Sequence, residues 1–428
     1  MSSKRRVAIT GFGVITPCGN GWEPYWDAAL HGRSAIRSAA PLKLNSPTFK
    51  YAGILPQFEP QEFIENRKSI KLMSREIQMA VAASRLALKD ANLSPEHYDP
   101  TRVGVTLGTG IINNELDEIG IGFRNGLDEN GHFSMPKFGQ EGIRSLFPLW
   151  FLKYLPNMPA CHVSVAYQLR GPNNTITTSS AASTQAIGEA YRVIERGDAD
   201  MMLAGGTDSK INAMGISRFQ LLGLLSKRDE APEKVYCPFD KRHDGIVLGE
   251  GAGILVLESF ENAKKRDAKI YSEVAGYGSS SDFNYDPRDP DDFTGKRVAI
   301  RRALEDAAIE PEDVDVLVAN GSGIPQEDIQ ESLAIHSFYA STFKKLHVTA
   351  VKPVTGNLVY GTGSVEAVVA ALVTCKGQVP PVTNLQDPAP ECSLPFVKGK
   401  AKSCEVNVSV LNTFGFGGQN ASLVFKKC

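Results

Sequence analysis

The chain has 428 residues, 42% hydrophobic and 22% charged, which fits a globular protein of one large or two medium domains. Its 46 basic and 48 acidic residues give a net charge of −2 without a long charge run, so neither nucleic acid nor a membrane surface is indicated as a partner. No apolar stretch would span a bilayer and the N-terminus lacks signal-peptide character, so we expect a cytoplasmic protein. The spacing of the seven cysteines and seven histidines predicts no metal site.

The N-terminal region predicts a strand, a helix and a second strand. Residues 7–15 form a β-rich run that ends in glycines, but no third glycine and no helix follow, so we reject a dinucleotide-binding loop and expect no cofactor. Residues 62–92 carry apolar side chains at three- and four-residue steps, which predicts a helix, and residues 103–107 predict a strand. Residues 124–160 are rich in glycine, asparagine, proline and aromatic residues, which indicates an irregular excursion over a pocket or an interface.

The centre of the chain alternates strand and helix. The β-branched run 174–178 predicts a strand that leads directly into a helix over 179–196, whose first turn is made of serine and alanine. Strands are predicted next over 201–206 and 249–258. The small first turn would let other backbone segments approach the helix closely.

A similar order recurs in the C-terminal part. Strands are predicted over 314–319, 348–352 and 406–411, and a helix of small residues over 361–372. The glycine-rich turns that feed apolar strands at 249–257 and 415–424 are weakly similar. We therefore predict an α/β protein built by internal duplication, with one half at 1–258 and the other at 259–428.

Ser180 lies where the predicted strand meets the predicted helix. A helix N-terminus presents unpaired N–H groups and partial positive charge, which favour a nucleophile or bind an oxyanion. Serine is also a preferred N-cap residue, so a purely structural role for Ser179 or Ser180 is the alternative.

Seven motifs in order make the chain resemble a β-ketoacyl-acyl-carrier-protein synthase of the elongating type over nearly its whole length. They lie at residues 7–17, 176–188, 204–208, 238–245, 248–253, 351–356 and 412–418. The resemblance implies the thiolase fold, in which two similar halves pack as five αβαβα layers. It also implies a dimer, with the site between the halves of each chain and an acyl-carrier protein delivering the acyl chain.

In that family a cysteine carries the acyl chain, two histidines assist decarboxylation, a lysine orders the site and a phenylalanine gates it. The matching positions hold Ser180, Asn320 and Asn357, whereas Lys352 and Phe416 are retained. Serine needs an adjacent base to act as a nucleophile, and asparagine can neither accept a proton nor carry positive charge. We therefore predict negligible condensation by this chain alone.

Two charged segments could have a functional role, but each also has a purely structural explanation. Residues 238–244 look catalytic but are interpreted as an ion-pair framework. A basic cluster is a candidate docking surface for an acidic carrier protein, with a solvated helix face as the alternative; its members are Arg67, Lys68, Lys71 and Arg75.

Three functional hypotheses remain open, one of which is a protein that binds acyl-carrier protein without chemistry. The first is a non-catalytic subunit similar to chain-length factors, which pair with an intact ketosynthase and help to set the product length. Those proteins usually replace the cysteine with glutamine, whereas this chain has Ser180. The second is an acyltransferase that uses Ser180 on an unusual acyl chain. The sequence leaves open whether the dimer is homomeric or formed with an intact ketosynthase.

Overall fold

Two five-stranded sheets, which hydrogen bonds join with one short strand into a continuous 11-stranded sheet, form the centre of the part of the chain that the computed structural model describes, residues 4–42, 49–282 and 293–428. The first sheet contains β1 (Val7–Thr16), β5 (Val103–Gly108), β6 (Asn173–Ile176), β7 (Met201–Ser209) and β8 (Glu250–Ser259). The second contains β9 (Ser272–Ser281), β10 (Val316–Val318), β11 (His347–Thr349), β14 (Val408–Phe414) and β15 (Gln419–Lys426). Their spatial orders, β1-β8-β7-β5-β6 and β9-β15-β14-β10-β11, are the same strand for strand, which confirms the predicted duplication. The boundary at residue 258 stays a prediction.

The two sheets share one hydrogen-bonded seam. β1 pairs antiparallel with β8 along its length and with β9 at its start, where Val7 lies opposite Val274. β5 runs parallel to β6 and β7, and β10 runs parallel to β11 and β14. Every residue of β1, β7 and β8 is buried. Such continuous burial is expected of strands that have helices on both faces.

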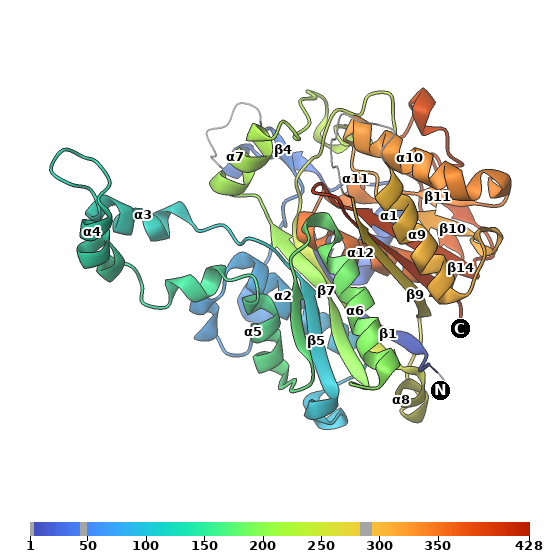
Figure 1. Cartoon of the computed structure of the whole chain (residues 1–428), viewed down its shortest axis with the longest axis horizontal. Coiled ribbons are helices and arrows are strands. Elements are labelled where there is room, and N and C mark those ends of the chain that lie inside the picture. The colour runs from blue at the N-terminus through green and yellow to red at the C-terminus, as the bar shows by residue number, and fades with distance from the viewer. Residues whose placement is uncertain (1–3, 43–48, 283–292) are drawn as a thin grey trace.

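Helices complete five layers, as Figure 1 shows. The central layer is α6 (Ala182–Arg196) with α12 (Thr362–Lys376), the first outer layer is α2 (Arg75–Asp90) with α5 (Met158–Tyr167), and the second is α9 (Thr294–Ala307) with α10 (Pro325–Tyr339). A Cβ atom at Gly363 would lie 2.0 Å from the Thr184 hydroxyl, so glycine is what lets α12 approach α6. The five-layer αβαβα arrangement is confirmed.

Shorter helices and strands lie outside the five layers. They are α1 (Trp22–Leu30), α7 (Ala213–Leu221), α8 (Phe260–Lys265), α11 (Lys352–Thr355), β2 (Gly19–Asn20), and the small pairs β3 (Arg37–Ser38) with β4 (Tyr51–Ala52) and β12 (Gln378–Val379) with β13 (Lys402–Ser403). The helix predicted over 62–92 begins only at Arg75, because the Ser74 hydroxyl accepts the N–H of Ile77 and caps it there. In the described ranges no helix has the length and apolar character needed to cross a membrane.

An extended arm leaves the body after β5, before the start of the region predicted as an irregular excursion, and continues into that region. It carries α3 (Leu116–Asn125) and α4 (Met135–Lys137), which project away from the layers in Figure 1. Phe123, Phe133 and Phe138 pack their rings together at 5.5–5.6 Å, yet Phe123 and Phe133 stay largely exposed. The arm therefore presents apolar surface that the described part of the chain does not cover.

Candidate active site

Ser180 lies in a strained turn between β6 and α6. The 3₁₀ turn Ser179–Ala181 links the two elements, and Ser179 adopts a left-handed backbone with φ of 54°. Such a conformation costs a non-glycine residue on the order of 1–3 kcal/mol and clusters at functional sites. Ser180 itself is only 3% exposed. The turn thus places Ser180 immediately before the N-terminus of α6, as predicted.

The glycine loop after β14 closes over this turn. A Cβ atom at Gly415 would lie 3.4 Å from the Ser180 backbone nitrogen, so the loop and the turn are in contact. Phe416 packs edge-on against Phe219 of α7, with ring centroids 5.6 Å apart. Both rings belong to one apolar cluster with Ile324 and Val359. The structure therefore brings the loop that carries Phe416 to the Ser180 turn and packs Phe416 against apolar side chains; its role as a gate stays a prediction.

Asn320 and Lys352 contact each other directly. The Lys352 ammonium donates to the backbone carbonyl of Asn320, to Asn320 Oδ1 at 3.0 Å and to Glu366 Oε1 at 2.8 Å. An ammonium has three hydrogens, and all three are used here. Lys352 and Glu366 are almost completely buried. Lys352 is therefore a charged donor that holds the Asn320 loop, and this arrangement does not suit a proton acceptor.

Asn357 caps the turn that follows it. Its Oδ1 accepts the backbone N–H of Val359 at 2.9 Å and the Thr362 hydroxyl at 3.0 Å. The Tyr236 hydroxyl donates to the carbonyl of Ser322 at 2.8 Å, within the loop that begins at Asn320.

Buried carboxyl groups support both loops. Glu331 of α10 accepts the N–H of Asn320 at 2.7 Å and of Gly321 at 2.8 Å, and burial raises its pKa to about 8. Burial likewise raises the pKa of Glu366 to about 7, against the opposing effect of the Lys352 ammonium. Sequence reasoning missed both residues. Glu366 carried a usable signal, because it is the sole charged residue of the otherwise small and apolar α12 before its terminal Lys376.

The raised pKa of Glu331 predicts that folding stability falls as the pH rises. Between pH 4.5, the ordinary pKa of a glutamate, and about pH 8, the folded state keeps a proton that the unfolded state releases. The free energy of unfolding therefore decreases as the pH rises through this range. We expect urea midpoints to decrease from pH 5 to pH 9 by the equivalent of a few kcal/mol. Glu331→Gln, which does not titrate, should flatten that dependence; an unchanged pH profile in the variant would contradict the assignment.

The predicted docking cluster is not uniform. Arg67, Lys68, Lys71 and Arg75 are all exposed. Arg75 differs from the other three because it forms a bidentate ion pair with buried Glu250, at 2.5 and 2.7 Å. Arg75 therefore anchors the start of α2 against β8. The segment interpreted as an ion-pair framework contains such pairs too: Arg242 binds Asp240 at 2.6 Å, and His243 contacts Asp328 at 2.9 Å.

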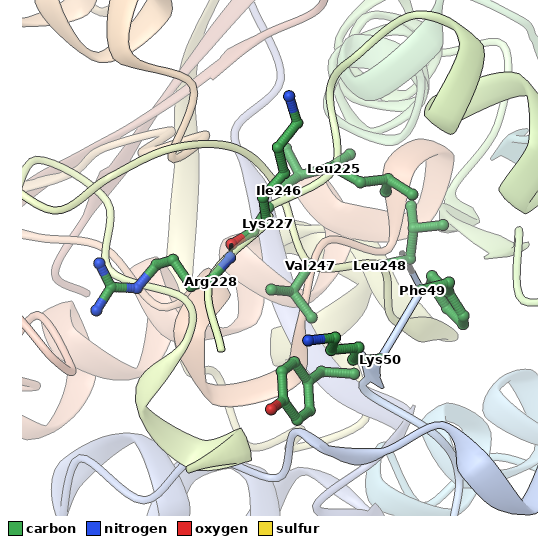
Figure 2. A pocket seen from close by; sticks show the side chains of 10 residues that line it. Phe49, Lys50, Leu225, Lys227, Arg228, Ile246, Val247 and Leu248 are labelled. Atoms are coloured by element: carbon green, nitrogen blue, oxygen red, sulfur yellow. Dashed lines mark hydrogen bonds between the residues drawn. The ribbon is translucent and has the colours of Figure 1, made fainter. Parts of the chain in front are cut away.

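A cavity of about 250 Å³ lies beside the site and is not lined by any of the three substituted positions. Figure 2 shows Phe49, Leu225, Ile246 and Leu248 among its apolar lining, with Lys227 and Arg228 extending away from Val247. The backbone that forms its wall also holds Asn357, because Val247 accepts the Asn357 N–H at 2.7 Å. The cavity is thus separated from Asn357 by a single segment of chain.

The five layers, the strained turn before α6 and the two supporting loops define a thiolase-like protein with its site between duplicated halves. Residues 4–263 match the family described as beta-ketoacyl synthase, N-terminal domain, and residues 271–386 match the corresponding C-terminal domain. The chain belongs to the β-ketoacyl synthase family.

Relatives match the whole chain. A 3-oxoacyl-[acyl-carrier-protein] synthase 2 of Staphylococcus aureus is 36% identical over 100% of this chain and 99% of its own length. Among solved structures, the ishigamide ketosynthase/chain length factor has a TM-score of 0.86 at 31% identity, with 100% of both chains covered. AntDE:AntF, a type II PKS acyl-carrier protein in complex with its ketosynthase, has a TM-score of 0.85 at 28% identity and the same coverage.

Proposed function

We propose that this protein is a non-condensing subunit of acyl chain elongation, similar to a chain-length factor, that works beside an intact ketosynthase. The observation that carries the proposal is the use made of the three polar side chains. Asn357 caps a turn, Asn320 accepts from Lys352, and the Lys352 ammonium has no free hydrogen. An amide cannot accept a proton and the fully bonded ammonium is a donor, so none of these groups can take a proton from Ser180 and the site lacks the groups that condense an acyl chain.

The exposed apolar arm supports a partner of the same fold. β6 is the last strand of its sheet in the described ranges, and Val165 on the adjoining α5 is 73% exposed. An open edge strand beside an apolar surface is typical of a face that another chain covers. The other exposed apolar side chains of the arm are Ile111, Leu116, Ile121, Phe123, Phe133, Met135, Ile143, Phe147, Leu149 and Phe151.

Co-expression tests this proposal directly. With a ketosynthase that retains its cysteine and both histidines, we expect a 1:1 heterodimer by native mass spectrometry. Val165→Asp should weaken that heterodimer by at least about tenfold, since it buries an unpaired charge, whereas Val165→Ala should be nearly neutral. A stable homodimer that takes up no such ketosynthase would refute the role.

We further propose that the exposed lysines and arginine before α2 dock an acidic acyl-carrier protein. A carrier protein in complex with its ketosynthase in a similar structure supports this partner class. Lys71→Glu should lower carrier affinity several-fold at low salt and less at high salt, because the contact is electrostatic. Arg75→Gln should instead lower the melting temperature, since it leaves Glu250 buried without its partner. Equal carrier binding by wild type and Lys71→Glu would exclude this surface.

The strained turn at Ser179 favours one second candidate, an acyltransferase that forms an ester on Ser180. Ser179 has a φ of 54°, a backbone conformation that is energetically costly for a non-glycine residue and that suits the presentation of a nucleophile by the next residue. Incubation with acyl-carrier protein would then produce an ester detectable by intact mass and absent from Ser180→Ala. No adduct with any chain length would remove this candidate.

A further inference from the structure

Tyr360 occupies the position in the second half of the chain that Ser180 occupies in the first. Each is the middle residue of a 3₁₀ turn, Ser179–Ala181 or Val359–Gly361, that leads into a central-layer helix. Each turn also begins with a left-handed residue, and Val359 has φ of 47°. The two turns contact each other. Because of the duplication, Tyr360 therefore lies on the turn that contacts the Ser180 turn.

The Tyr360 ring lies at one end of the apolar cluster that contains Phe416 and Phe219. It covers Gly110, where a Cβ atom would lie only 1.9 Å from the ring carbon that bears the hydroxyl. The ring therefore lies across the segment that follows β5, at the root of the arm.

A buried ion pair lies behind the ring. The Lys210 ammonium is 5.1 Å from the Tyr360 ring centroid and donates to Asp208 at 2.5 Å and to the Ile111 carbonyl at 2.8 Å. Asp208 also accepts the backbone N–H of Tyr360 at 3.3 Å. Lys210 and Asp208 are both buried. A hydrocarbon chain that displaced the ring would meet a desolvated ion pair, which offers no favourable contact to methylene groups.

We propose that Tyr360, backed by the Lys210–Asp208 ion pair, is the end wall of the acyl-binding space and sets the longest chain that this protein holds. An acyl chain presented near Ser180 enters the apolar cluster around Phe416 and Phe219 and stops at the Tyr360 ring. The inference rests on the proposed acyl-holding function but assigns the length limit to a particular side chain.

The test is the affinity of the isolated full chain for acyl-pantetheines of increasing even chain length, measured by titration calorimetry. Each buried methylene raises affinity about fourfold, so affinity should climb by roughly 15-fold per two-carbon step and stop climbing at the end wall. In Tyr360→Gly the climb should continue to longer chains. Tyr360→Phe, which keeps the ring and loses the hydroxyl, should retain the wild-type limit.

Melting temperatures identify folded variants, and Tyr360→Ala takes the place of Tyr360→Gly if the glycine variant does not fold. A limit that is the same in wild type and in the folded small-residue variant overturns the proposal, as does absence of acyl-pantetheine binding by both. A shifted limit in a chain that forms no heterodimer would support the end wall while refuting the subunit role. If the length limit does not shift but the chain does form the heterodimer, the end wall is refuted and the subunit role is supported.

Discussion

Ser180→Cys is expected to leave the isolated chain without measurable condensation of an acyl group with malonyl-carrier protein. The new thiol would lie in the strained turn at the N-terminus of α6, where a thiolate is favoured, so it should accept an acyl group. Decarboxylation would still fail, because Asn320 and Asn357 cannot supply the acid–base assistance of imidazole. That assistance is worth about 10²–10⁴-fold in rate.

The matched variant is the triple substitution Ser180→Cys with Asn320→His and Asn357→His. An imidazole at 357 can accept the Val359 N–H that Asn357 accepts now, so the turn has a substitute cap. We expect the triple variant to be the first in the series to release carbon dioxide from malonyl-carrier protein, as followed with labelled carboxylate. Condensation by Ser180→Cys alone, or by wild type, would contradict the inference that the histidine positions limit the chemistry.

Much of the site was predictable because its residues lie in contiguous motifs. A β-branched run followed by small residues predicted β6 and α6, and with them the place of Ser180. The repeated order of strands and helices predicted two similar sheets. The strand β9 and the helices α9 and α10 were not predicted. In α10, charged residues such as Asp328 and Glu331 are buried, so the polar pattern gave no sign of a helix that packs in the core.

The contacts that decide the chemistry join residues that are far apart in the chain. A local sequence pattern cannot predict such contacts. Lys352 was singled out from its motif, but its partners Asn320 and Glu366 lie 32 and 14 residues away. From the sequence, Asn357 was interpreted only as the replacement of a catalytic base. In the structure it caps a turn, and the turn includes Val359 in a left-handed conformation. Arg75 looked like one of four equivalent docking residues until its ion pair with Glu250 separated it from them. Burial and pairing, which depend on the tertiary fold, made each distinction.

Lys352→Met is expected to destabilise the protein by about 3–5 kcal/mol, the usual cost of removing one partner from a buried ion pair. Glu366 would keep a buried carboxyl whose Oε2 already has no hydrogen-bond partner among the described residues, and Asn320 would lose the donor to both of its oxygens. Lys352→Met with Glu366→Leu removes both charges and should recover most of the loss. Urea unfolding of the two single variants, the double variant and wild type measures the coupling.

The pH dependence of this loss separates a structural ion pair from a catalytic lysine. The pKa of Glu366 is raised to about 7 even with Lys352 present, so the methionine variant should keep this carboxyl protonated to a still higher pH. Its folded state then holds a proton that the unfolded state releases above 4.5, and its stability falls further than that of wild type as the pH rises. The gap between wild type and Lys352→Met should therefore widen from pH 6 to pH 9. A gap that stays below about 1 kcal/mol throughout would mean that Lys352 does not hold this site together and is free to serve in proton transfer.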